Sequence, residues 1–127
     1  MFTLSQEKLV PLGASITTAE IKQQPELWAE TFALYTDKSR EIEEFLFKLS
    51  TKYSRVRVIF TGAGTSAYVG DTVTPYLKEK VDENQWELLS IPTTTLVSNP
   101  YQFLKPDMPT LHDPFAGSGH SPETVAA

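Results

Sequence analysis

The chain has 127 residues, of which 40% are hydrophobic and 21% are charged, so it is long enough to form one domain with a core. Its net charge of -5 and its eleven Lys and Arg residues, which form no run, argue against a nucleic-acid-binding protein. Without cysteine it has no disulfide framework and no thiolate zinc site, and no window is long and apolar enough for a transmembrane helix. We therefore expect a cytoplasmic protein that binds neither nucleic acid nor membrane.

The first part of the chain predicts a tail followed by a long helix. Residues 1–16 show no period and contain a proline and a glycine, which indicates a loosely docked tail. Thr17 and Glu20 have the spacing of a capping box, so a helix should begin near them, and Pro25 can begin a second segment. Apolar residues then recur three, four and seven positions apart, and this stripe is typical of a helix face that packs in a core. The stripe consists of Trp28, Phe32, Tyr35, Ile42, Phe45, Leu46, Leu49 and Tyr53.

A strand, a glycine turn and a helix start follow. Residues 56–60 form a short β-branched and aromatic run, as expected of a strand that is buried on both faces. Gly62 and Gly64 can adopt positive φ and leave no Cβ between the backbone and a ligand, while Thr65 or Ser66 can cap the next helix. Because a helix N-terminus carries partial positive charge, the unit suits an anion such as phosphate.

Four interpretations of this turn compete. A nucleotide-binding P-loop would need a lysine after Gly64, and none is there. The dinucleotide fingerprint is met formally by Gly62, Gly64 and Ala67, but the next strand ends at residues 90–93 without the acid that would hold a ribose. Two adjacent hydroxyls suit the three oxygens of a phosphate monoester. An ordinary strand-to-helix turn with capping hydroxyls is the alternative that the pattern alone leaves open.

The next helix and strand are plain from the sequence. The helix should extend to about Lys80 and kink or break at Pro75, because proline is poorly tolerated in a helix interior. After a polar connection, residues 86–91 predict a second strand, which ends at Pro92 and is followed by three threonines.

A second glycine and hydroxyl turn comes near the end of the chain. Residues 98–100 indicate a turn before a short helical piece at 101–104, and a third strand is expected in 110–115. The turn at 116–121 follows that strand directly, with Ser121 placed as the N-cap of another helix. In a parallel sheet the two turns can converge at the topological switch point. Such a site, made of hydroxyls and backbone N–H groups, suits a phosphorylated polyol or sugar.

Four segments carry a resemblance to a known family. They are 60–66 (FTGAGTS), 91–94 (IPTT), 97–100 (VSNP) and 118–127 (SGHSPETVAA). From Thr18 onward the chain resembles the first half of a sugar isomerase (SIS) domain, in particular that of bacterial tagatose-6-phosphate ketose/aldose isomerases, also described as galactosamine-6-phosphate deaminase/isomerases. The resemblance implies an α/β fold, a flavodoxin-like three-layer sandwich around a parallel sheet, here preceded by a long amphipathic helix.

The resemblance also implies an organisation and a function. We expect an N-terminal tail at 1–16, a helical lead-in at 17–54 and an incomplete SIS phosphosugar-binding domain at 55–127. The function implied is phosphosugar binding within the N-terminal part of a sugar-phosphate isomerase or an amino-sugar-phosphate deaminase of carbohydrate metabolism. Such an enzyme needs no cofactor, and the complete protein would be a homo-oligomer, while this piece alone would be inactive. The alternatives are a non-enzymatic regulatory module that senses a phosphosugar, and a truncated inactive copy.

Matching this sequence to the family motifs assigns the phosphate to the two turns. The phosphate-binding residues implied are Gly64, Thr65, Ser66, Ser118, Gly119 and Ser121. The further substrate contacts implied are Thr94, Ser98 and His120. No catalytic residue is assigned, because the proton-transfer groups of related isomerase domains lie later in the chain. The sequence also shows no His, Asp and Glu constellation that would predict a metal site.

The predicted third strand departs from the family pattern. His112, Asp113 and Pro114 stand where the family strand is continuously apolar. A proline in a central strand removes a ladder hydrogen bond, and burying Asp113 without a partner would cost on the order of several kcal/mol. Gly117 stands where an arginine is usual, so a cation is missing there. We interpret His112 as a strand anomaly and not as a catalyst, and His120 as either a solvated loop residue or a contact to phosphate or sugar hydroxyls.

Overall fold

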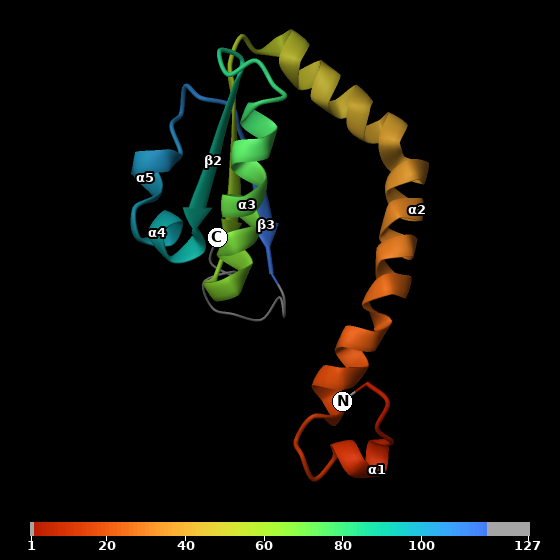
Figure 1. The fold of residues 1–127 in the computed structure, drawn as a ribbon. Coiled ribbons are helices and arrows are strands. Elements are labelled where there is room, and N and C mark those ends of the chain that lie inside the picture. The colour runs from red at the N-terminus through yellow and green to blue at the C-terminus, as the bar shows by residue number, and fades with distance from the viewer. Residues whose placement is uncertain (1, 117–127) are drawn as a thin grey trace. The chain divides into compact units, whose positions relative to one another are not determined.

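A computed structural model describes residues 2–116 of the chain (Figure 1). Met1 and residues 117–127 lie outside the described residues. The chain divides into two units, Met1–Phe45 and Leu46–Ala127, and each is described by itself. The domain boundaries expected from the sequence, after residues 16 and 54, stay a prediction.

The first unit opens with a helical turn where the sequence suggests a loose tail. Helix α1 (Gln6–Leu9) ends in a Schellman motif, in which Gly13 adopts a φ of 63° and the Ala14 N–H bonds the Leu9 carbonyl at 3.1 Å. Leu9 and Thr18 are each only 1% exposed, so this turn is packed and not loose. The glycine that looked like a loop residue is thus the helix terminator.

Helix α2 (Ser15–Lys52) is continuous and begins two residues before the predicted capping box. Pro25 lies inside it and does not begin a second segment, although its missing N–H removes one helical hydrogen bond. The polar face carries ion pairs such as Arg40 Nε to Glu44 at 3.0 Å, a spacing that supports long helices. Among the described residues of the first unit no element packs against the apolar stripe of α2, so its packing into a core stays a prediction.

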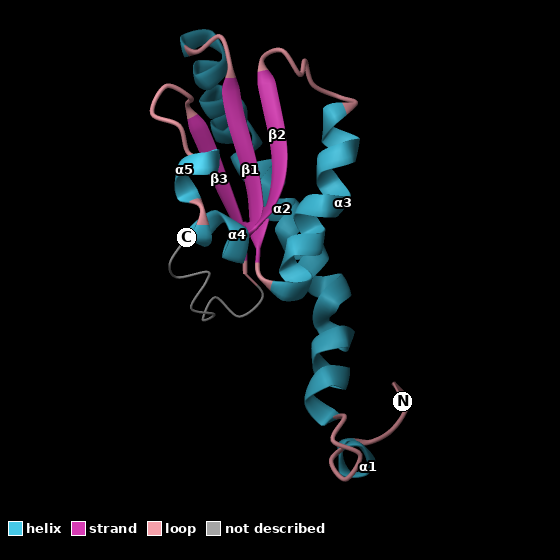
Figure 2. Ribbon diagram, turned by 90° about the vertical axis from the view of Figure 1, so that its left-hand side faces the viewer, coloured by secondary structure: helices cyan, strands magenta, loops and turns pink. Residues whose placement is uncertain are grey.

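The second unit is built on a parallel sheet, which confirms the α/β class (Figure 2). Its strands are β1 (Val56–Gly62), β2 (Trp86–Pro92) and β3 (Thr110–Phe115), in the order β2-β1-β3. A short 3-10 turn η1 (Gly64–Ser66) and helix α3 (Ala67–Lys78) connect β1 to β2, and helices α4 (Thr93–Ser98) and α5 (Pro100–Phe103) connect β2 to β3. All three strands agree with the sequence prediction, whereas α4 was not foreseen in the threonine triplet.

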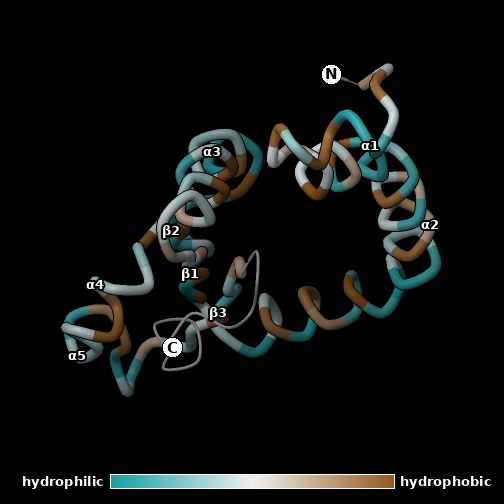
Figure 3. The backbone as a smooth tube through the Cα atoms, turned by 90° about the horizontal axis from the view of Figure 1, so that it is seen from below, coloured by the Kyte–Doolittle hydropathy of each residue, from teal (hydrophilic) through white to brown (hydrophobic). Residues whose placement is uncertain are grey.

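The two connections cover opposite faces of the sheet (Figure 3). Val58, Phe60 and Leu88 are buried on the face against which α3 packs. Because side chains alternate along a strand, Arg57 and Ile59 point to the other face, on which α4 and α5 lie. The strands are therefore sandwiched between helices, which gives the expected layers.

Both interior prolines of the second unit are accommodated. Helix α3 runs through Pro75 without a break. Just before β3, the carbonyl of Pro109 accepts a hydrogen bond from the N–H of Arg57 in β1 at 2.8 Å. Since a parallel ladder uses alternate residues, position 114 directs its nitrogen away from β1. Within the sheet formed by residues 2–116, Pro114 therefore removes no hydrogen bond to β1, and the predicted loss does not occur there.

The charge that the sequence places in β3 is also tolerated. β3 is an edge of the described sheet, and Asp113 on it is exposed. The cost expected for burying this carboxylate does not arise, because water solvates it.

Candidate functional site

The carboxyl ends of the three strands lie level with one another. Gly62 at the end of β1 is in register with Pro92 on one side and Phe115 on the other. The chain leaves β1 over the α3 face and reaches β3 over the opposite face, so the topological switch point lies between β1 and β3. In open α/β sheets, ligands bind in the crevice beside such a point.

Two glycines shape the turn at this position for different reasons. Gly64 adopts a φ of 57°, as predicted, which a residue with a Cβ rarely does. Gly62 is needed for space, since a Cβ there would lie 2.5 Å from the carbonyl oxygen of Ser66 and 2.6 Å from the amide nitrogen of Ala67. Without a side chain at Gly62, the start of α3 folds directly onto the end of β1.

The hydroxyls of this turn are not used as caps. Ser66 is the N-cap of α3 and has helical dihedral angles of -66° and -24°, with no side-chain cap hydrogen bond. The predicted capping role is therefore wrong, because η1 leads into α3 as a continuous helical turn and the Ser66 side chain does not fold back. Thr65 is exposed and Ser66 is partly exposed, and neither side chain bonds another group of the described chain. Both hydroxyls are thus available beside a helix N-terminus.

Close packing of α3 on the sheet depends on a glycine that the sequence prediction missed. A Cβ at Gly70 would lie 2.6 Å from the hydroxyl oxygen of Ser90 and 3.0 Å from the Cβ of Phe60. The dinucleotide fingerprint instead predicts Ala67 as the third small residue. A glycine inside a helical pattern costs stability and so signals a packing role, which is the clue that could have identified Gly70. The Ser90 hydroxyl also donates to a carboxylate oxygen of Asp71 at 2.7 Å.

The threonines after β2 form the start of α4. Thr93 is 2% exposed and anchors this helix beneath the strand end. Thr94 is exposed in the first turn of α4, and Ser98 is exposed at its last residue. Their assignment as substrate contacts stays a prediction.

The second predicted turn, with Gly117, Ser118, Gly119, His120 and Ser121, lies outside the described residues. Its share in phosphate binding is not tested and stays a prediction. What the structure gives is the position of the residue before it, since Phe115 ends β3 beside Gly62.

His112 has a partner that sequence reasoning did not identify. Its Nε2 lies 2.7 Å from the hydroxyl oxygen of Thr61, a residue that is 2% exposed. Contacts between residues 51 positions apart leave no signal in a single sequence.

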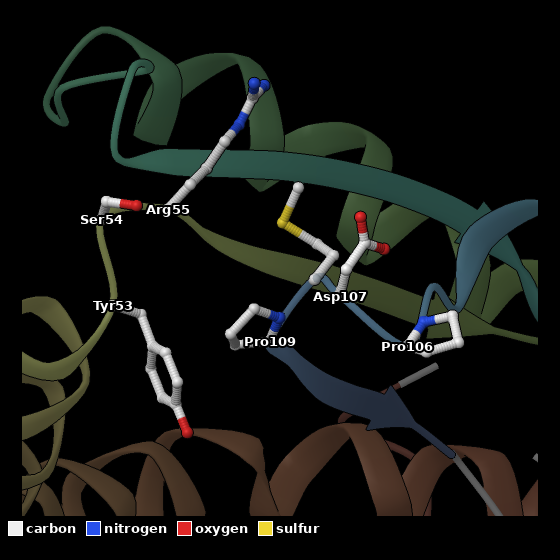
Figure 4. Close-up of a pocket in the computed structure, with 7 residues that line it drawn as sticks. Tyr53, Ser54, Arg55, Pro106, Asp107 and Pro109 are labelled. Atoms are coloured by element: carbon white, nitrogen blue, oxygen red, sulfur yellow. The ribbon is translucent and has the colours of Figure 1, made fainter.

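A hollow of about 440 Å³ lies at the opposite, amino-terminal end of the sheet (Figure 4). It is lined by Tyr53, Ser54, Arg55, Pro106, Asp107, Met108 and Pro109. Figure 4 shows that the Arg55 and Tyr53 side chains point in opposite directions. A ligand site needs a few polar groups that converge, so this hollow indicates no ligand.

The described residues 2–116 contain no group of three or more His, Asp or Glu side chains that could hold a metal ion. Nor does this part of the chain contain a helix that is long and apolar enough to span a membrane.

Comparison with curated proteins bears out the resemblance seen in the sequence. The chain is 38% identical over 124 residues to the D-galactosamine-6-phosphate deaminase AgaS of Shewanella sp. (strain ANA-3), a match that covers 98% of this chain and 32% of that protein. It is 40% identical over 124 residues to the protein of the same name from Escherichia coli O157:H7, covering 95% and 31% of the two chains. The chain thus spans about a third of the length of these relatives. No protein-family model matches it.

Solved structures agree with the sequence matches. A crystal structure from Clostridium novyi NT, provisionally named a tagatose-6-phosphate ketose/aldose isomerase, superposes with a TM-score of 0.87 at 36% identity and covers 99% of this chain and 31% of that one. The tagatose-6-phosphate ketose/aldose isomerase of Escherichia coli gives a TM-score of 0.74 at 37% identity, over 87% of this chain and 29% of that one. The chain is therefore similar, in sequence and in fold, to the N-terminal part of these proteins.

Proposed function

We propose that this chain forms the phosphate-binding part of an SIS-type sugar-phosphate isomerase or amino-sugar-phosphate deaminase, starting from its similarity to the N-terminal part of such proteins. The observation that carries the proposal is the turn at the end of β1. There, Gly64 with its φ of 57° lies at the N-terminus of α3 with the hydroxyls of Thr65 and Ser66, which bond no group among residues 2–116. The substrate class is a hexose 6-phosphate or its 2-amino counterpart, in the cytoplasm and without a cofactor.

The turn suits a phosphate monoester on chemical grounds. Backbone N–H groups at the first turn of a helix have no partner within the helix and carry partial positive charge. Hydroxyl groups add donors that can rotate toward a phosphate oxygen. The β1/β3 switch point is where open α/β sheets bind ligands, and the strand ends give the turn a rigid base. Ser118, Gly119 and Ser121 remain part of the proposed site, with Thr94, Ser98 and His120 as proposed sugar contacts.

In the proposed reaction a base moves a proton between C1 and C2 of the open-chain sugar phosphate. Binding the phosphate places the reacting carbons beside that base, so the binding energy of the phosphate is used to position the substrate. Among residues 2–116, the first turn offers hydroxyls and backbone amides, which suit binding and not proton transfer. We place the proton-transfer groups in the part of the longer relatives that this chain does not span.

The test is a binding measurement on the 127-residue chain by titration calorimetry. Galactosamine 6-phosphate and tagatose 6-phosphate should bind, and the unphosphorylated sugars should bind at least roughly a hundredfold more weakly, because each hydrogen bond to a charged oxygen contributes about 1.5 to 3 kcal/mol. Binding should be the same with and without a chelator. Equal affinity for galactosamine and its 6-phosphate, or binding that requires a divalent cation, would contradict the phosphate assignment.

Turnover gives a separate measurement of the same proposal. The chain alone is expected to bind the phosphosugar without converting it. If it isomerises or deaminates the sugar, the catalytic groups lie within these residues, and the proposed separation of phosphate binding from proton transfer is wrong.

A further inference from the structure

The contact between Thr61 and His112 links the two strands that flank the switch point. Thr61 is the penultimate residue of β1, and its hydroxyl oxygen lies 2.7 Å from Nε2 of His112 in β3. With 2% exposure, Thr61 has almost no access to water that could replace this partner. Losing His112 would leave a buried hydroxyl unsatisfied, which is costly in a protein interior.

The two side chains lie diagonally across the β1–β3 ladder. His112 is in register with Ile59, and Thr61 is in register with Pro114. Because alternate residues share a face, Thr61 and His112 both point to the face that α3 does not cover. The imidazole is therefore not directed at the α3 N-terminus, and its Nε2 is already engaged by Thr61. This geometry argues against a direct catalytic role for His112.

The position of Thr61 affects the glycine turn, because the backbone of the next residue, Gly62, is packed tightly against the start of α3. A Cβ at Gly62 would lie within 2.6 Å of backbone atoms of Ser66 and Ala67, so the backbone here is in tight contact with the start of α3. A shift of Thr61 along the strand would carry Gly62 with it and displace the turn that holds Gly64. The end of β1 and the turn therefore behave as one rigid piece.

We propose that His112 is a positioning residue for the phosphate site, acting through Thr61. The hydrogen bond fixes the end of β1 against the middle of β3, and thereby fixes the position of the first turn relative to β3. The inference rests on the proposed function for its effect on ligand binding. The sequence alone indicates only an anomaly at position 112, whereas the contact with Thr61 gives His112 a structural role.

Affinity for galactosamine 6-phosphate provides the first test. His112→Leu and Thr61→Val each remove one partner with little change in volume, and each should raise the dissociation constant by roughly 3- to 10-fold, the loss expected for one neutral hydrogen bond. The double variant should bind about as well as either single variant, because both lose the same contact. His112→Gln and Thr61→Ser keep hydrogen-bonding groups and should bind within about twofold of the wild type.

A matched control comes from the same strand and face. Thr110→Val removes a hydroxyl that bonds the carbonyl of Met108 at 3.0 Å, close to its own position in the chain and at the far end of β3. It should leave the affinity unchanged. The positioning role is wrong if the increases in the dissociation constant multiply in the Thr61→Val/His112→Leu double variant. It is also wrong if His112→Gln binds as weakly as His112→Leu.

A measurement without ligand separates this inference from the proposed function. In a ¹H–¹⁵N spectrum, His112→Leu should move the amide signals of Gly62 and Gly64, and Thr110→Val should not. If the wild type binds no phosphosugar but His112→Leu still moves these signals, the proposed function is wrong and the positioning of the turn stands. If His112→Leu leaves both the signals and the affinity as in the wild type, the inference is wrong.

Discussion

Arg57 and Glu87 form an ion pair between adjacent strands, with Arg57 Nε 2.5 Å from a carboxylate oxygen of Glu87. A guanidinium N–H of the same Arg57 donates to the backbone carbonyl of Phe103 in α5. The two side chains are only 13% and 25% exposed, so the pair is shielded from solvent. One side chain thus ties β1 to β2 and to the connection that leads to β3.

Neutralising this pair should destabilise the second unit. Glu87→Gln keeps the size of the side chain but leaves the charge of Arg57, and that of Arg55 at 3.2 Å, without a carboxylate. We expect a loss of about 1 to 3 kcal/mol in the free energy of unfolding, measured in urea. The matched control is Glu44→Gln, which breaks the pair with Arg40 at 3.0 Å on side chains that are 54% and 89% exposed. A surface pair of that kind contributes less than about 0.5 kcal/mol. Equal losses in the two variants would show that burial of the Arg57 pair does not matter.

The two glycines of the first turn should respond differently to alanine. Gly62→Ala forces a methyl group against the backbone of Ser66 and should cost about 3 kcal/mol or more, because backbone atoms cannot move aside. At Gly64 a Cβ would meet nothing within 4 Å, so Gly64→Ala carries only the strain of positive φ, about 1 to 2 kcal/mol. Gly13→Ala, with a φ of 63° and equally open space, is the control for that strain. Thermal unfolding that ranks Gly64→Ala as the more damaging would contradict this assignment.

The hydroxyl of Ser66 should contribute to binding and not to folding. Ser66→Ala is expected to weaken phosphosugar binding by about 1.5 to 3 kcal/mol, the loss of one hydrogen bond to a charged oxygen. Unfolding should change little, because the side chain makes no cap hydrogen bond. Thr72→Ala is the control on the same helix, since its hydroxyl bonds the Tyr68 carbonyl at 2.7 Å. Unchanged affinity in Ser66→Ala, measured by calorimetry, would remove Ser66 from the site.

Strands and the glycine turn could be predicted because their signals are local. The run that ends at Gly62 is too short and too β-branched for a helix, and the φ of Gly64 follows from its place before a helix start. The helix α4 was missed because threonine is a poor helix signal, and burial of Thr93 overrides that weak propensity here. Tertiary packing therefore determined the helical conformation of residues 93–98, where the local sequence signal was weak.

The outcome at β3 could not be predicted, because it depends on which side each residue faces. Whether Pro114 removes a ladder bond is set by the register of β3 on β1, and whether Asp113 is buried is set by what covers that face. The pairing of His112 with Thr61 likewise requires two strands to meet in one register. The sequence identifies these residues as unusual, while their consequences belong to the folded sheet.

The last prediction concerns the outer edge of β3, which pairs with no further strand among residues 2–116. Position 112 directs its N–H away from β1, and beside this edge Val58, Phe60, Leu88 and Leu111 line an apolar hollow of about 260 Å³. An unpaired strand edge beside apolar surface favours pairing with another chain, so the 127-residue chain should sediment as a concentration-dependent oligomer.

A charge at the hollow should reverse this association. Leu111→Lys places an ammonium group beside the edge and should shift the chain to a monomer with an unchanged far-ultraviolet circular dichroism spectrum, since lysine blocks edge pairing. Tyr101→Lys, at an 88% exposed residue of α5 on the opposite face, is the control and should leave the association intact. A wild-type chain that stays monomeric at every concentration, or an oligomer that Leu111→Lys does not dissociate, would show that the β3 edge is not the contact.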